Sequence, residues 1–207
     1  HLIDAKQRGK PDFKTLAIAA LDEIRQTLSM MAGFGMLSMD EVEPILARVT
    51  ISPLRKCAAA LAESDIIFEG VPETLDAKRA AFALISEHAN NGAIIASTTS
   101  TILSNDLQGF VSVPERFLNA HWLNPAYLVP LVELSPGEKT DPTVTEHLKS
   151  LLERIGKVPV VCAASPGYIV PRIQMLAMNE AARMVEEGVA TAEDIDKATK
   201  YGFGFRF

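Results

Sequence analysis

Short apolar runs alternate with stretches of helical periodicity along the first 163 residues. The apolar runs, which end at turn residues, predict strands, and the intervening stretches predict amphipathic helices. The expected strands are 1–4, 66–69, 93–96, 117–121, 131–134 and 158–162, and the expected helices are 11–32, 38–48, 53–62, 75–90 and 142–155. This alternation is typical of an α/β fold in which helices cover both faces of a mainly parallel sheet. Because the last strands have short connections, we expect part of the sheet to be antiparallel.

The pattern changes after Ser165-Pro166-Gly167. Residues 168–187 read as one long helix, and Thr191 begins another. We therefore predict two domains, an α/β domain over residues 1–163 and the start of an all-helical domain over residues 164–207. The apolar face of the long helix is either core or a dimer interface.

Composition narrows the class of protein. The 207 residues are 48% hydrophobic and 22% charged, and the net charge of −6 argues against nucleic acid or an anionic membrane as the main partner. No apolar run approaches the roughly 20 residues of a membrane span, and no signal peptide opens the chain. Cys57 and Cys162 lie in apolar contexts, and the four histidines form no cluster, so we expect a cytoplasmic protein without a metal site.

Both ends of the chain have the character of truncations. There is no initiator methionine, Leu2-Ile3 reads as the end of a buried strand, and no closing element follows the last amphipathic run. We expect a longer protein on both sides.

Residues 121–133 carry the clearest chemical signal. His121 and Glu133 lie on two apolar runs joined by a proline-bounded turn, so their side chains can meet across neighbouring strands. A carboxylate on one imidazole nitrogen fixes the tautomer and leaves the other nitrogen free to accept a proton. The alternative is a surface histidine near an unrelated acid, but a buried carboxylate needs a partner. Ser100 ends an earlier apolar run and would add a hydroxyl to the same cleft.

Charged side chains follow two of the expected strands. Asp4 ends the first of these strands. In a dinucleotide-binding fold, an acid about 20 residues after the glycine fingerprint binds the ribose of NAD and disfavours NADP. After the next expected strand, Gly70 and Val71 would allow a cofactor to approach the backbone, and Glu73 and Lys78 would contact ribose or substrate. The alternatives are a turn residue for Asp4 and a solvated charge pair for Glu73 and Lys78.

Two G-x-G strings follow helical patterns instead of strands, at Gly33-Phe34-Gly35 and Gly202-Phe203-Gly204. We interpret both as glycines that end helices, not as phosphate loops.

Several motifs together resemble the NAD-dependent L-3-hydroxyacyl-CoA dehydrogenase family. They are Ala96-Ser97-Thr98-Thr99-Ser100, His121-Trp122-Leu123-Asn124-Pro125, Leu131-Val132-Glu133, Ser165-Pro166-Gly167-Tyr168-Ile169-Val170, Asn179-Glu180 and Val185-Glu186-Glu187-Gly188. Their order and separations match the family over essentially the whole chain. The resemblance implies a Rossmann-type NAD-binding domain, whose first strand and glycine loop are missing here, and a helical domain that forms a homodimer. It also implies a role in fatty acid metabolism, the oxidation of a short 3-hydroxyacyl-CoA of the 3-hydroxybutyryl-CoA type.

The same resemblance implies a role for each matched residue. His121 would be the general base, Glu133 its orienting partner, and Ser100 a contact to the substrate oxygen and the nicotinamide. Asn124, in the His-x-x-Asn-Pro motif, would lie near the nicotinamide and the substrate. The other family positions that contact the cofactor are Asp4, Glu73 and Lys78.

Departures from the family pattern leave the substrate open. Pro171 replaces an asparagine that helps to hold the substrate carbonyl, and proline has no side-chain donor. The ending Gly204-Phe205-Arg206-Phe207, together with the stretch from Asn124 to Leu131, looks more like the small-acid branch of the family, which includes gulonate, carnitine and diketo-ester reductases. Arg206 would pair with a free carboxylate. The alternatives are therefore the same hydride transfer on a small 3-hydroxy acid, or a non-catalytic NAD-binding or structural relative. A serine hydrolase that uses Ser100 is a poorer interpretation, because no G-x-S-x-G turn surrounds it.

Overall fold

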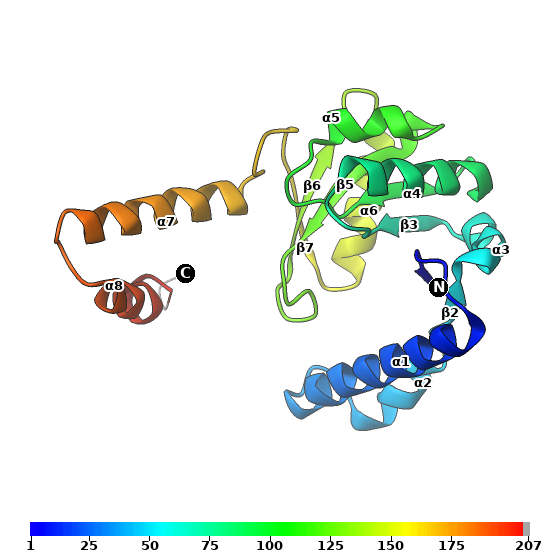
Figure 1. Cartoon of the computed structure of the whole chain (residues 1–207), viewed down its shortest axis with the longest axis horizontal. Helices are drawn as coiled ribbons and strands as arrows, with labels where there is room; N and C mark the ends of the chain where they lie inside the picture. Colours follow the sequence, from blue (N-terminus) through cyan, green and yellow to red (C-terminus); the bar gives the residue numbers. More distant parts are fainter. Residues whose placement is uncertain (205–207) are drawn as a thin grey trace. The chain divides into compact units, whose positions relative to one another are not determined.

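The computed structural model describes residues 1–204, in which seven strands are interspersed with helices (Figure 1). The strands are β1 (Leu2–Asp4), β2 (Ile51–Pro53), β3 (Ile66–Glu69), β4 (Ile94–Ser97), β5 (Phe117–Trp122), β6 (Leu131–Pro136) and β7 (Val158–Val161). The α-helices are α1 (Lys10–Gly33), α2 (Val42–Leu46), α3 (Cys57–Glu63), α4 (Leu75–His88), α5 (Ser104–Leu107), α6 (Pro142–Arg154), α7 (Val170–Glu186) and α8 (Ala192–Ala198). Short 3-10 helices are η1 (Met39–Glu41), η2 (Leu54–Lys56), η3 (Gln108–Phe110) and η4 (Pro114–Arg116), and η5 (Thr199–Phe203) is a π-helical turn.

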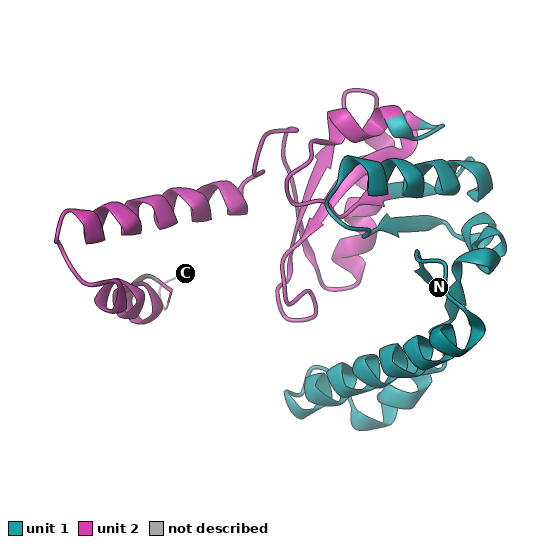
Figure 2. Ribbon diagram, viewed as in Figure 1, with its two compact units in different colours: residues 1–95, 110–113 teal, residues 96–109, 114–207 magenta. Residues whose placement is uncertain are grey.

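The chain divides into two compact units (Figure 2). The first contains residues 1–95 and 110–113, and the second contains residues 96–109 and 114–207. The predicted domain boundary near residue 164 lies within the second unit and stays a prediction.

In the first unit, β1 and β2 form a two-stranded parallel sheet in which Asp4 lies opposite Pro53. The sequence pattern did not predict β2, and the helix expected over 53–62 begins with η2 and continues as α3. Helix α1 packs against α2, and α4 packs against α3 and β3. Asp4 thus lies at the carboxyl end of a parallel strand, as expected.

The larger sheet has the strand order β3-β4-β5-β6-β7. Strands β5 and β6 are antiparallel, whereas β6 and β7 are parallel. Helices α5 and α6 pack against β6, and α6 also packs against β7. The structure confirms the predicted α/β Rossmann-like fold with an antiparallel part, followed by a helical segment.

The core around β5 and β6 consists of consecutive strand residues, buried on both faces of the sheet, and one face of α6. Phe117, Val132 and Leu134 are fully buried, and Leu148 and Leu152 of α6 are equally inaccessible. The four-residue spacing of the last two keeps them on one helix face. Burial of these core residues fixes the register of β5 against β6.

Helix α6 is capped by Asp141. Hydrogen bonds from the Thr143 hydroxyl and amide lower the pKa of the Asp141 carboxyl group.

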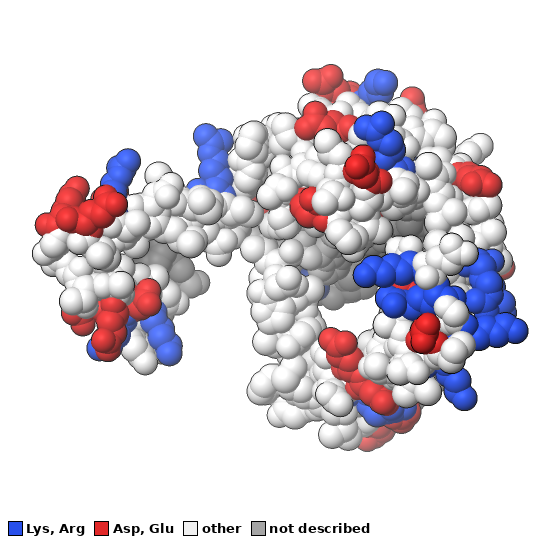
Figure 3. Space-filling model, in the orientation of Figure 1, with Lys and Arg blue, Asp and Glu red and all other residues white. Residues whose placement is uncertain are grey.

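Helices α7 and α8 occupy the positions that periodicity predicts, and the Thr191 side chain caps α8 by accepting the Asp194 N–H. On the face seen in Figure 3, much of α7 is uncharged. Its most exposed large apolar side chains are Ile173, Met175, Leu176 and Met178. The predicted dimer interface on this helix stays a prediction.

Both G-x-G strings close helices, as predicted. Gly33 is the last residue of α1, and Gly35 has a φ of +73° and donates its N–H to Ala32. Gly202 lies in η5, and Gly204 follows it. Within residues 1–204, no helix combines the length and apolar character that crossing a bilayer requires.

Candidate active site

His121 on β5 and Glu133 on β6 are direct cross-strand partners. Their side chains meet with 2.8 Å between His121 Nδ1 and Glu133 Oε2, and His121 is only 5% exposed. The expected meeting of the two side chains is therefore present. Because a carboxylate accepts only, Nδ1 carries the proton of this hydrogen bond, and in the neutral imidazole Nε2 is then the acceptor nitrogen. This arrangement prepares Nε2 to accept a proton.

The second oxygen of Glu133 makes contacts that the sequence did not predict. Oε1 accepts the backbone N–H groups of Ile169 and Val170, at 2.9 and 2.8 Å, where α7 begins. A helix N-terminus has unpaired N–H groups and favours a negative charge. Glu133, which is fully buried, thus holds His121 with one oxygen and the start of α7 with the other.

Cys162, directly after β7, is affected by the charge of the Glu133 carboxylate. Burial raises the pKa of its thiol above the ordinary value, and the negative charge of Glu133 raises it further. The thiol is therefore a poor nucleophile at neutral pH.

Ser100 lies in the loop after β4, and this loop is tied to the strand that carries His121. The Asn119 side chain donates to the Thr99 carbonyl at 3.2 Å. Since Asn119 and His121 are two residues apart on β5, they share one face of the strand. The contact therefore places the Ser100 loop on the His121 face. The role of Ser100 itself stays a prediction.

The turn after β5 contains Asn124, which is exposed. Lys157, which sequence reasoning missed, donates its ammonium group to the carbonyls of Ala126 and Val129, the latter at 3.0 Å. The same ammonium lies 5.6 Å from the centre of the Trp122 ring, a distance typical of a cation–π contact. Lys157 thus stabilises the turn that positions Asn124.

Two predicted substrate contacts lie at the far end of the chain. Pro171 is in the first turn of α7, next to Val170, whose N–H binds Glu133. This is where proline is tolerated in a helix. Arg206 lies outside the described residues.

In the first unit, Asp4 presents a nearly buried carboxylate at the end of β1. Its side chain is 8% exposed, and its oxygens accept from the Lys6 N–H at 3.1 Å and from Arg8 Nε at 2.7 Å. A fixed carboxylate after a strand fits the ribose hydroxyls of NAD. The contact with Arg8 was not expected from the sequence.

Lys78 on α4 forms a buried ion pair with Glu69, at 3.1 Å, and a second pair with Glu73, at 3.2 Å. Lys78 and Glu69 have side chains that are 1% exposed, whereas Glu73 is 38% exposed. The alternative of a solvated charge pair is therefore wrong for Lys78. Glu69, which the sequence did not single out, also accepts the Val71 N–H at 2.7 Å. It therefore holds the turn that includes Gly70.

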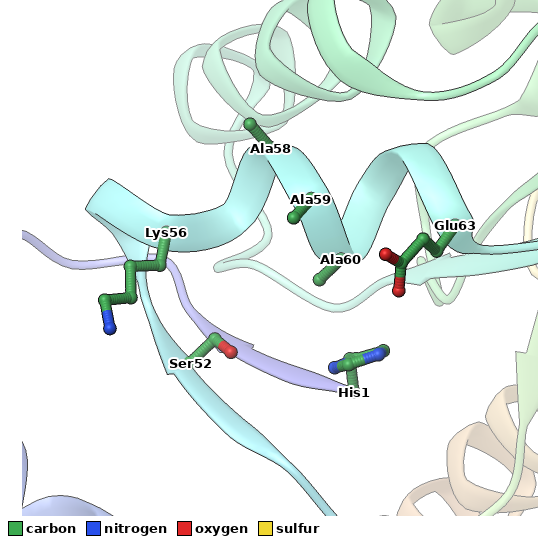
Figure 4. A pocket seen from close by; sticks show the side chains of 7 residues that line it. All are labelled: His1, Ser52, Lys56, Ala58, Ala59, Ala60 and Glu63. Carbon is green, nitrogen blue, oxygen red and sulfur yellow. The ribbon is translucent and has the colours of Figure 1, made fainter.

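A cavity of about 410 Å³ lies elsewhere in the first unit, between the start of β1, β2 and α3 (Figure 4). His1, Ser52 and Ala60 are among its lining residues, and none of the predicted site residues lines it. In the described part of the chain, His, Cys, Asp and Glu form no group of three that could hold a metal ion.

Comparison with known proteins gives a consistent family. Residues 12–165 match the NAD-binding domain of 3-hydroxyacyl-CoA dehydrogenase, and residues 167–207 match its C-terminal domain.

Individual relatives agree with this family but differ in substrate. The chain is 39% identical to an L-carnitine dehydrogenase of Mesorhizobium japonicum over 72% of this chain and 42% of the relative. It is 34% identical to the 3-hydroxyadipyl-CoA dehydrogenase of Escherichia coli over 90% of this chain and 38% of the relative. The crystal structure of 3-hydroxybutyryl-CoA dehydrogenase from Escherichia coli matches with a TM-score of 0.83 and 32% identity, over 96% of this chain and 40% of that one.

The chain thus spans less than half of the length of these relatives. Its match to the family nevertheless covers both the α/β part and the helical segment. The chain belongs to the 3-hydroxyacyl-CoA dehydrogenase family and contains an NAD-binding domain of that family.

Proposed function

We propose that the protein catalyses the reversible, NAD-dependent oxidation of a short-chain 3-hydroxyacyl-CoA to the 3-oxoacyl-CoA. The observation that carries this proposal is the buried pair of His121 and Glu133, 2.8 Å apart, within an NAD-binding domain. A buried imidazole oriented by a carboxylate is an arrangement that general-base catalysis often uses.

His121 Nε2 would remove the proton of the 3-hydroxyl group during oxidation and return it during reduction. Bound NAD supplies the hydride acceptor for this reaction. Glu133 would stabilise the imidazolium that forms, because its charge already faces Nδ1 at hydrogen-bond distance. Ser100 and Asn124 would contact the reacting oxygen and the nicotinamide.

Asp4 and the turn after β3 carry the proposed contacts to the adenosine half of NAD. Asp4 would bind the ribose hydroxyls through its fixed carboxylate. Glu73, which is partly exposed, would add a contact beside Gly70 and Val71, in the turn that Glu69 fixes, and Lys78 would hold Glu73 in place from the buried side.

The choice of a CoA ester is supported by the share of this chain that one relative matches. The 3-hydroxyadipyl-CoA dehydrogenase matches 90% of this chain, whereas the L-carnitine dehydrogenase matches 72% at higher identity. The match to L-carnitine dehydrogenase, together with Pro171 in place of a polar residue, supports a second candidate substrate. This candidate is a free small 3-hydroxy acid such as L-carnitine.

Initial rates of NADH formation separate these candidates. We expect the protein with NAD to oxidise 3-hydroxybutyryl-CoA with a higher kcat/KM than L-carnitine. The opposite order would replace the first candidate by the second. Binding of NAD without turnover of any 3-hydroxy substrate would contradict both and favour a non-catalytic relative.

The orienting role of Glu133 predicts the effect of Glu133→Gln. Glutamine retains an oxygen for the Ile169 and Val170 amides, but its NH₂ group would donate to Nδ1 and place the imidazole proton on Nε2. We expect kcat to fall roughly 10- to 100-fold, less than for loss of the base itself. The urea midpoint of unfolding should change little.

A second readout follows the charge of Glu133 directly. Because this charge helps to raise the pKa of the Cys162 thiol, Glu133→Gln should speed its alkylation by iodoacetamide, measured by peptide mass spectrometry. Glu153→Gln, an equal charge change at an exposed position of α6, is the matched control. It should change neither kcat nor the alkylation rate of Cys162. Unchanged kcat in Glu133→Gln would contradict the orienting role.

A further inference from the structure

Tyr168 contacts His121 on the face of its ring. The centres of the two rings are 5.4 Å apart and their planes are inclined by 29°, which is a stacked arrangement. Tyr168 is only 3% exposed, so its ring forms part of the wall around the imidazole. Whereas Glu133 fixes one nitrogen of His121, Tyr168 restricts the tilt of the whole ring.

The Tyr168 hydroxyl reaches a different element, the loop that carries Ser100. It donates to the Ile102 carbonyl at 3.0 Å. The Ile102 N–H in turn donates to Thr99 Oγ1 at 3.0 Å, and the Thr99 carbonyl accepts from Asn119. Ser100 therefore lies in a turn that is held by β5 on one side and by Tyr168 on the other.

The backbone at Tyr168 indicates that this placement is imposed by tertiary contacts. Its φ is +44°, a left-handed conformation that is unfavourable for a residue with a β-carbon. The preceding Gly167 has a φ of +76°, and a β-carbon there would lie 3.3 Å from the Arg172 nitrogen. Such conformations persist only where surrounding contacts determine them. For Tyr168, the stack and the hydroxyl hydrogen bond are such contacts.

We infer that Tyr168 is a positioning residue that couples the Ser100 loop to His121 through a single side chain. The ring keeps the imidazole in the plane set by Glu133, and the hydroxyl keeps Ser100 at a fixed position beside it. The catalytic consequence rests on the proposed function, whereas the two contacts can be tested without turnover.

Tyr168→Phe removes only the hydroxyl and keeps the ring. We expect hydrogen exchange of the amides of residues 99–102 to become faster, while the His121 ring resonances in NMR spectra keep their positions. Since a hydrogen bond of this kind is worth roughly 0.5–1.5 kcal/mol, kcat should fall about 2- to 10-fold, with the dissociation constant of NAD unchanged. Tyr201→Phe, at a 63% exposed tyrosine, is the control and should change none of these.

Tyr168→Leu removes the ring as well. The His121 ring protons should then shift, because the ring current of Tyr168 is lost, and the pH profile of kcat/KM should change shape. Wild-type exchange of residues 99–102 in Tyr168→Phe would overturn the hydroxyl contact, and unshifted His121 resonances in Tyr168→Leu would overturn the stack. If the faster amide exchange and the shifted His121 resonances both occur but the wild-type protein has no dehydrogenase activity, the two contacts stand and the proposed function fails.

Discussion

His121→Gln is expected to lower kcat for the 3-hydroxyacyl substrate by about 10²- to 10⁴-fold, the usual contribution of a general base. Glutamine can keep a hydrogen bond to Glu133, but it has no nitrogen that accepts a proton at neutral pH. The dissociation constant of NAD should remain near the wild-type value, because no cofactor contact is removed. Rates of NADH formation, together with NAD titration followed by calorimetry, measure both quantities.

His147→Gln is the matched control for this substitution. His147 is exposed on α6, so its replacement should leave kcat unchanged. Full activity of His121→Gln would refute the base, and an equal loss of NAD binding would point to a general defect in folding.

Lys78→Met is expected to lower the free energy of unfolding by about 3–5 kcal/mol, the usual cost of breaking a buried ion pair from one side. Methionine has a similar length, but it leaves the buried Glu69 carboxylate without its cation. Urea unfolding followed by circular dichroism measures the change.

Two controls separate the buried charge from other effects of the substitution. The double variant Lys78→Met with Glu69→Gln removes both charges and should recover part of the lost stability. Lys149→Met breaks an exposed pair with Glu146 and should cost less than about 1 kcal/mol. Wild-type stability of Lys78→Met would show that the pair is not buried in solution.

Periodicity predicted much of the fold because most strands are marked by several consecutive apolar residues. Strand β3 occurs with the predicted bounds, Ile66–Glu69, and β5 and β6 extend the predicted runs by one or two residues. Strand β2 was missed because it has only three residues, ends at Pro53, and leads directly into a helical turn. Its pairing with β1 is a long-range property that local periodicity does not encode.

The meeting of His121 and Glu133 could be predicted because each side chain interrupts an apolar run. The first run ends, and the second begins, at the same proline-bounded turn. The partners of Glu69, Lys157 and Tyr168 could not be predicted in this way. Lys78 reads as a solvated residue near the start of a helix, and only packing of α4 on β3 buries it against Glu69. Tyr168 contacts Ile102, 66 residues away, in a backbone conformation that local propensity disfavours.

Under the proposed function, the two hydrogen bonds from the start of α7 to Glu133 would make the helical segment part of the acid–base apparatus. If this helix withdraws from the sheet, the carboxylate loses two of its three donors and the imidazole loses a rigid support. Proton transfer would then depend on correct docking of α7, so that a partly assembled protein would bind its cofactor without being competent to react.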